Sequence, residues 1–111
     1  MDQSLVARTR KAFSGAEDVR EKVMFGSVGF MVNGKLCVGA RESRIMCRID
    51  PAQRDALLAR RGCHPMTMKG REYRGYVLVD SAALRTDEDL QLWVGLALDF
   101  NARLVSADRG R

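Results

Sequence analysis

What the sequence lacks rules out several kinds of site. It has one histidine, His64, so a metal centre would need carboxylates or cysteines gathered around a single imidazole. Its three cysteines, Cys37, Cys47 and Cys63, are odd in number and show no Cys-x-x-Cys spacing. This usage is typical of free thiols in a reducing compartment, and it predicts neither a disulfide framework nor a zinc site. We therefore expect no metal and no cofactor.

Export and membrane signals are also missing. The N-terminus, Met1-Asp2-Gln3-Ser4, lacks the basic segment and long apolar run of a secretory signal peptide. No apolar run approaches the roughly 20 residues of a membrane-spanning helix. We expect a cytoplasmic protein without a membrane partner.

Familiar catalytic motifs are absent as well. The segment Gly26-Ser27-Val28-Gly29 lacks the frame of a nucleophile elbow, and no Gly-Lys-Ser/Thr follows it as in a phosphate-binding loop. Cys63 and His64 are adjacent in sequence, which does not bring a thiol and an imidazole into attack geometry. The sequence thus predicts no enzyme and no small-molecule substrate, and a small enzyme using Cys63 and His64 is kept only as the last of three hypotheses.

The remaining composition is that of one folded domain. The chain has 111 residues, of which 46% are hydrophobic and 30% charged, and no segment is of low complexity. We assign the domain to residues 1–104 and expect residues 105–111 to form a disordered basic tail. The formal net charge of +5 permits attraction to nucleic acid or to another acidic partner.

A hairpin centred on Asn33-Gly34 organises the first half of the chain. Both residues tolerate the positive φ that a two-residue type I′ turn requires. Gly26 and Gly29 indicate a sharp corner or bulge shortly before it. Apolar residues alternate on both sides of the turn and are expected to share one sheet face: Val28, Phe30 and Val32 before it, and Leu36, Val38 and Ala40 after it.

Periodicity and capping residues predict the other elements. We expect a helix over residues 3–13, a strand over 18–25 with Glu21 near its frayed start, and another strand over 44–49. Asp50-Pro51 predicts a helix that runs to about Arg61, followed by an irregular loop over 63–74 and a strand over 75–80. The order α-β-β-β-β-α-β-α predicts an α+β fold, with helices packed on an antiparallel sheet of about five strands.

The last predicted helix carries more apolar surface than one sheet face needs. Thr86 and Asp89 have the spacing of a capping box at its start. Its apolar stripe comprises Leu90, Trp93, Val94, Ala97 and Phe100, and Leu92, Leu96 and Leu98 widen it. Either both sides of the helix are covered within the domain or one packs on a second subunit, and we expect a homodimer.

A basic helix-and-loop surface offers an alternative function, weakly selective nucleic-acid binding. Its candidate contact residues are Arg54, Arg60, Arg61, Lys69, Arg71 and Arg74. The cations at 60 and 61 are also explained by the negative end of a helix dipole. No helix-turn-helix, zinc finger or aromatic RNA-binding strand accompanies them.

One ordered set of motifs resembles a known family. Met24, Phe25, Gly26 and Gly29, followed by an apolar strand and then Asn33-Gly34-Lys35, are similar to the signature of the TfoX N-terminal domain family, also called the TfoX/Sxy family. Weaker matches follow in the family's order: Arg48-Ile49-Asp50, Lys69-Gly70, Tyr76-Val77-Leu78-Val79, and Leu90 with Trp93-Val94. The resemblance covers roughly residues 3–104.

The resemblance implies a regulatory or protein-interaction domain that is not an enzyme. Proteins of this family are associated with the regulation of bacterial competence genes, and no catalytic residue or cofactor follows from the match. A compact fold similar to secretion chaperones, which often dimerise, is implied. The chain departs from the pattern at Ser27, where a second glycine is common, and at Asp80, where a proline is common. It also stops before the helical C-terminal domain of full-length TfoX proteins, so we expect a stand-alone copy.

Overall fold

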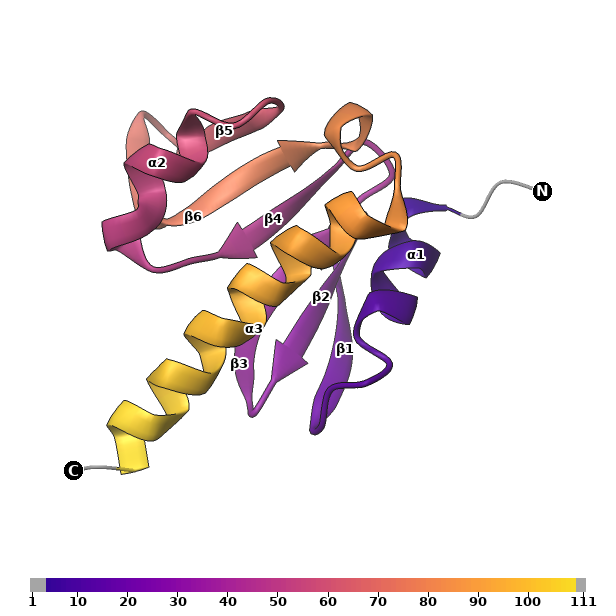
Figure 1. The fold of residues 1–111 in the computed structure, drawn as a ribbon, viewed down its shortest axis with the longest axis vertical. Coiled ribbons are helices and arrows are strands. Elements are labelled where there is room, and N and C mark those ends of the chain that lie inside the picture. The colour runs from indigo at the N-terminus through magenta and orange to yellow at the C-terminus, as the bar shows by residue number, and fades with distance from the viewer. Residues whose placement is uncertain (1–3, 110–111) are drawn as a thin grey trace.

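The computed structural model describes residues 4–109, which form an antiparallel sheet covered on one side by helices (Figure 1). The sheet has six strands in the order β1-β2-β3-β4-β6-β5. In chain order the elements are α1 (Leu5–Ala12), β1 (Val19–Met24), β2 (Ser27–Val32), β3 (Lys35–Ala40), β4 (Arg44–Arg48), α2 (Arg54–Leu58), β5 (Cys63–Met68), β6 (Arg71–Asp80) and α3 (Asp87–Arg109), with short 3₁₀ turns at Pro51–Gln53 and Ser81–Ala83.

The first four strands form the predicted antiparallel meander. Asn33 and Gly34 have φ values of 53° and 77°, the positive pair of a type I′ turn. Along β4, Ile45 and Cys47 are fully buried whereas Arg44 is exposed, which is the expected alternation. The α+β class and the antiparallel sheet are therefore confirmed.

A β-bulge changes the direction of Leu36. Phe30 pairs with Val38, but Met31 pairs with Leu36, so β3 contains one extra residue at this point. Leu36 consequently lies on the side away from the helices, where its Cδ1 is 3.3 Å from the position a Cβ would take on Gly29. Cys37 is fully buried in its place. The prediction that Leu36 shares the inner row with Val38 was wrong, because period-two alternation does not survive a bulge.

The helix predicted to run to Arg61 is much shorter. Asp50 caps it as expected, since its carboxylate accepts a hydrogen bond of 2.9 Å from the Ala52 N–H. The α-helical part ends at Leu58, and the chain then turns through Gly62 at a φ of 78°. A Cβ on Gly62 would lie 2.5 Å from the Cβ of Ala83. This close approach lets the chain turn and enter the sheet at Cys63.

Residues 63–74 are not the irregular loop that the sequence predicted. They hold strand β5, a two-residue turn at Lys69–Gly70 and the start of β6, which begins at Arg71. Strand β5 is at the edge of the sheet, where Pro65 costs no ladder hydrogen bond. Pairing with β6 is irregular between Pro65 and Thr67, which hides the strand periodicity. The sheet therefore has one strand more than the five expected.

Glu21 is a tether and not part of a frayed end. It lies opposite Phe30 on the helix side of β1, and its carboxylate accepts hydrogen bonds of 2.6 and 2.8 Å from the Arg10 guanidinium of α1. These bonds hold the pKa of Glu21 below its usual value. The first helix is thereby attached to the edge strand.

Helix α3 crosses the inner face of the sheet and packs against α1, β3 and β4 (Figure 1). It begins with the predicted capping box, in which the Asp89 N–H donates to Thr86 Oγ1 at 3.1 Å and the Thr86 N–H donates to Asp89 Oδ2 at 3.3 Å. It continues to Arg109, so residues 105–109 are helical and not the disordered tail that we expected. Residues 110 and 111 lie outside the described residues.

The core fills the space between the sheet and the helices. Phe13 stacks on Phe30 with ring centroids 5.1 Å apart, and the predicted positions Leu90, Val94 and Ala97 of α3 are buried. A polar residue continues this stripe: the side chain of Asn101, only 3% exposed, makes the hydrogen bonds described below. The core thus includes a hydrogen-bonded polar contact between α3 and the sheet, made by Asn101.

Candidate interaction surface

The outer face of the sheet, the side opposite the helices, holds the methionines. Five methionines follow Met1 in the chain, and two of them, Met31 and Met46, alternate with residues that point into the core. Four of the five line one hollow, to which all six strands contribute residues. The hollow has a volume of about 180 Å³, and its lining comprises Met24, Ser27, Gly39, Arg41, Arg44, Met46, Met66, Thr67, Met68 and Leu78.

Two glycines make this hollow possible. Gly29 of β2 and Gly39 of β3 are paired directly across the strands, so no side chain rises from the middle of the outer face. The methyl carbon of Met24 lies 3.0 Å from where a Cβ would stand on Gly29, and that of Met46 lies 3.5 Å from the same position on Gly39. Flexible thioether chains, which can change shape around a bound group, therefore lie over a glycine floor.

Cations edge the hollow. Arg41 and Arg44 both line it and are exposed, and neither forms an ion pair with any residue between 4 and 109. Arg48, further along β4, lies over the Tyr76 ring at 5.9 Å. Two acids lie close to these arginines, and both have other partners. Asp80, opposite Arg44, is bound by His64 at 2.7 Å, and the Glu42 carboxylate accepts hydrogen bonds of 3.3 and 3.5 Å from the Leu5 and Val6 N–H groups. The outer face therefore combines an apolar centre with a positive edge.

Phe25 projects from the turn beside this hollow. It joins β1 to β2 between Met24 and Ser27, which are paired, and both of these residues line the hollow. Phe25 and Gly26 have φ values of 40° and 78°, so the turn has the same positive pair as Asn33–Gly34. The Phe25 side chain is 98% exposed. A bulky residue at positive φ is unusual, and a large apolar side chain that is almost fully exposed is also unusual.

The six predicted cationic contacts do not form one surface. Arg54 is only 5% exposed, with Nη2 3.2 Å from Glu72 and Nη1 3.5 Å from Asp55, so it is a structural ion pair and not a contact residue. The exposed cations then fall into two groups at opposite ends of β5: Arg60 and Arg61 precede it, and Lys69, Arg71 and Arg74 follow it. Cys63 and Met68, at the two ends of β5, are five residue steps apart, or about 16 Å of chain.

Arg60 and Arg61 do meet other charged groups. They line a hollow of about 420 Å³ with Arg85, Asp89 and Trp93, between the end of α2 and the start of α3. Asp89 is already committed to the capping box. Three arginines thus share this hollow with one acid, Asp89.

Cys63 and His64 point to opposite sides of β5 and do not form a nucleophile–base pair. Cys63 pairs with Val79 and is buried, whereas His64 pairs with Leu78 on the outer side and binds Asp80. Burial raises the pKa of Cys63 and raises that of Cys37 to about 12, which keeps both thiols protonated at neutral pH. The geometry offers no support for the thiol-based alternative.

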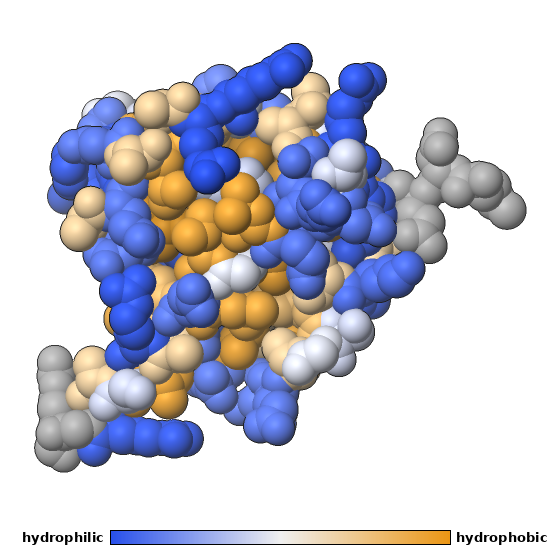
Figure 2. Space-filling view, in the orientation of Figure 1, coloured by the Kyte–Doolittle hydropathy of each residue, from blue (hydrophilic) through white to orange (hydrophobic). Residues whose placement is uncertain are grey.

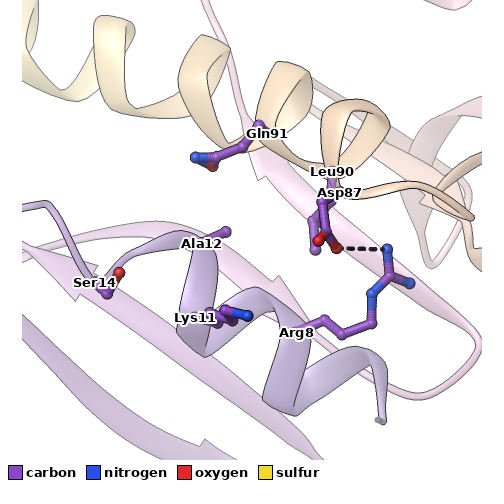
Figure 3. Close-up of a pocket in the computed structure, with 7 residues that line it drawn as sticks. All are labelled: Arg8, Lys11, Ala12, Ser14, Asp87, Leu90 and Gln91. Atoms are coloured by element: carbon purple, nitrogen blue, oxygen red, sulfur yellow. Dashed lines mark ion pairs between the residues drawn. The ribbon is translucent and has the colours of Figure 1, made fainter. Parts of the chain in front are cut away.

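Another crevice separates α1 from α3 (Figure 3). It has a volume of about 200 Å³, and Arg8, Lys11 and Ser14 face Asp87, Leu90 and Gln91 across it. Arg8 reaches over the crevice to Asp87 with an N–O distance of 3.6 Å, the dashed contact in the figure. We interpret the crevice as part of the contact between the two helices.

Residues 4–109 contain no group of three histidine, cysteine or acidic side chains placed to hold a metal ion. No helix in this part of the chain is both long and apolar enough to cross a membrane.

Sequence reasoning found the turn at 25–26 but missed the surface around it. Phe25 was identified only as a motif residue, and Arg41, Arg44 and Met46 were not selected at all. The alternation of arginine and methionine at positions 44, 46 and 48 contained a signal, since methionine there faces away from the core. Asn101 was missed although it stands in phase with Leu90, Val94 and Ala97, where an apolar residue would be expected.

The molecule is a small α+β domain whose sheet is covered by helices on one face. A protein from Pseudomonas syringae, solved as a structural genomics target, has a similar fold: the two superpose with a TM-score of 0.61 at 11% identity, over 87% of this chain and 96% of the other. The chain belongs to the TfoX N-terminal domain family, whose model matches residues 11–101. No curated protein matches the chain significantly.

Proposed function

We propose that this domain is a non-enzymatic regulator that acts by binding another protein in the bacterial cytoplasm, as the competence regulators of its family suggest. Membership in the TfoX N-terminal domain family supports a regulatory role. The observation that carries the binding role is Phe25, an aromatic side chain left 98% exposed at the tip of a hairpin. Three free cysteines fit a reducing compartment.

The proposal is tested by isolating a complex. The tagged full chain is produced in a bacterium that carries its own copy, captured after nuclease treatment, and the co-purifying protein is then produced separately and mixed with it. We expect a complex of fixed stoichiometry by size-exclusion chromatography with light scattering. Recovery of nucleic acid alone, or of no partner that binds again when purified, would contradict the proposal.

We also propose that the domain is a homodimer formed through α3. Apolar atoms gather along the middle of the helix side, over this helix (Figure 2). Leu92 of this helix is 40% exposed, and a Cβ on Gly95 would meet nothing within 4 Å. Glycine inside an exposed helix costs about 1 kcal/mol relative to alanine, and a close approach of a second helix would explain its presence.

Sedimentation velocity at micromolar concentration tests this contact. We expect a dimer for the wild type and a monomer for Leu92→Lys. Met68→Lys makes the same kind of change on the outer face and should leave the dimer intact. A wild-type monomer would remove this part of the proposal without affecting partner binding.

Nucleic-acid binding is the rival function, supported by the hollow that gathers Arg60, Arg61 and Arg85. It predicts binding of a labelled duplex that weakens steeply with salt and is lost when Arg60 and Arg61 are changed to glutamate. Fluorescence anisotropy at low and physiological salt measures this. Tight binding at physiological salt that depends on these arginines would favour the rival.

A further inference from the structure

We propose that the methionine hollow of the outer face, together with Phe25, binds an acidic segment of a partner protein that also carries apolar side chains. This inference rests on the proposed function and adds the surface and the chemistry of the partner. It is carried by three features that meet at one place: the Phe25 turn, the methionine hollow and two exposed arginines.

The stability of the fold does not account for a phenylalanine at position 25. Its φ of 40° is the region that asparagine and glycine favour, and its side chain is 98% exposed. The two neighbours in the turn, Met24 and Ser27, line the hollow. An exposed aromatic ring held by an unfavourable backbone conformation at the rim of an apolar hollow has the properties of a binding anchor.

The hollow is lined by groups that adapt to an apolar ligand. Met24 and Met46 lie over the paired glycines, Met66 and Met68 close the hollow from β5, and Met68 is 53% exposed. Methionine side chains are polarisable and flexible, so such a surface repacks around different apolar side chains. Thr67 and Ser27 are the uncharged polar groups of the lining.

The charges at the rim select an acidic partner. Arg41 and Arg44 are exposed and have no ion pair within residues 4–109, and Lys22 on the neighbouring β1 adds a further cation on the same face. A second copy of this chain, docked face to face, would place cations against cations. Carboxylates flanking an apolar residue would meet the arginines while the apolar side chain enters the hollow.

Selection from a displayed library of random peptides tests the inference with a defined probe. The full chain is immobilised, and enriched peptides are synthesised and titrated by isothermal calorimetry against the wild type and single variants. We expect the enriched peptides to be net negative with at least one large apolar residue. Their affinity should fall at least tenfold with Phe25→Asn and with Arg44→Glu.

Arg61→Glu is the matched control, because it makes the same charge change on the helix side. It should change the peptide affinity less than twofold. Circular dichroism establishes that each variant is folded. Gly39→Ala adds one methyl group to the floor at an ordinary contact distance, 3.5 Å from Met46, and should weaken peptide binding without unfolding the sheet.

Methyl-labelled methionine locates the peptide directly. On titration, the methyl resonances of Met24, Met46, Met66 and Met68 should shift, and that of Met31, outside the hollow, should move least. Three outcomes would overturn the inference. They are failure to select any peptide, equal peptide affinity for the wild type and Phe25→Asn, and methyl resonances that shift with a single-stranded oligonucleotide but not with an acidic peptide.

The same variants separate this inference from the proposed function. If the partner isolated from cells still binds Phe25→Asn and Arg44→Glu, the protein-binding function holds and the assigned surface is wrong. If no protein partner rebinds, the function itself fails.

Discussion

Two turns of this domain have the same backbone and opposite surroundings. Asn33–Gly34 and Phe25–Gly26 each join neighbouring strands with two residues at positive φ. Asn33 is fastened inward: its Nδ2 donates to Asn101 Oδ1 at 3.1 Å, and its N–H donates to the Asp18 carbonyl at 3.1 Å. Phe25 makes no such contact and stands in solvent.

The difference shows which turn the fold explains. Asparagine is the residue that a type I′ turn prefers, and here it also satisfies a buried polar group of α3. Phenylalanine is disfavoured by the same backbone and gains no burial in return. Folding therefore accounts for Asn33, whereas Phe25 requires a reason outside the isolated domain.

The largest effect on stability should follow from removing the Asn101 hydrogen bonds at the Asn33–Gly34 turn. In Asn101→Ala, the buried Val32 carbonyl loses the 2.9 Å hydrogen bond from Asn101 Nδ2, and Asn33 loses its partner. We expect the free energy of unfolding to fall by about 3 kcal/mol, measured by urea denaturation. A loss below about 1 kcal/mol would mean that water replaces the hydrogen bonds of Asn101.

Placing phenylalanine in the Asn33–Gly34 turn should also destabilise the protein. Asn33→Phe introduces a bulky side chain at a φ of 53° and removes the bond to Asn101. We expect a loss of about 2 kcal/mol in thermal or urea unfolding. Asn33→Gly is the control, because it keeps the backbone free to adopt positive φ and loses only the hydrogen bond.

The reciprocal change should stabilise the protein. Phe25→Asn relieves the backbone at a φ of 40° and removes an exposed ring, and we expect a gain of about 1 kcal/mol. The same variant is expected to lose peptide binding, as described above. If it unfolds more easily than the wild type, Phe25 has a role in folding and the contrast between the two turns is wrong.

The smallest effect concerns the tether of the strand that leads to Phe25. The Arg10 hydrogen bonds lower the folded-state pKa of Glu21, so the contribution of this ion pair is present above the unfolded pKa and is lost as the pH falls through the folded one. Unfolding followed from pH 6 to pH 3 should show a shallower loss of stability in Glu21→Gln. An unchanged pH dependence would show that the pair contributes nothing measurable.

Local chemistry made much of this fold predictable. The turn at Asn33–Gly34, the capping box of Thr86 and Asp89, and the alternation along β4 depend on residues close together in the chain, and all three are confirmed. The family motif around Met24–Gly26 was identified for the same reason. Such signals depend on backbone sterics and on hydrogen bonds between residues close in the chain, so they act whatever the tertiary structure.

Contacts between distant residues decided the rest. Strand β5 exists because β6 pairs with it despite Pro65 and an irregular register, and Arg54 is buried because Glu72 of that hairpin reaches it. A bulge turned Leu36 outward, and pairing of Gly29 with Gly39 opened the hollow beneath Met24. By itself the sequence determined the turns, the caps and the fold class, while the tertiary structure decided which methionines and arginines share the outer face, because strand register and bulges place side chains that local propensity cannot.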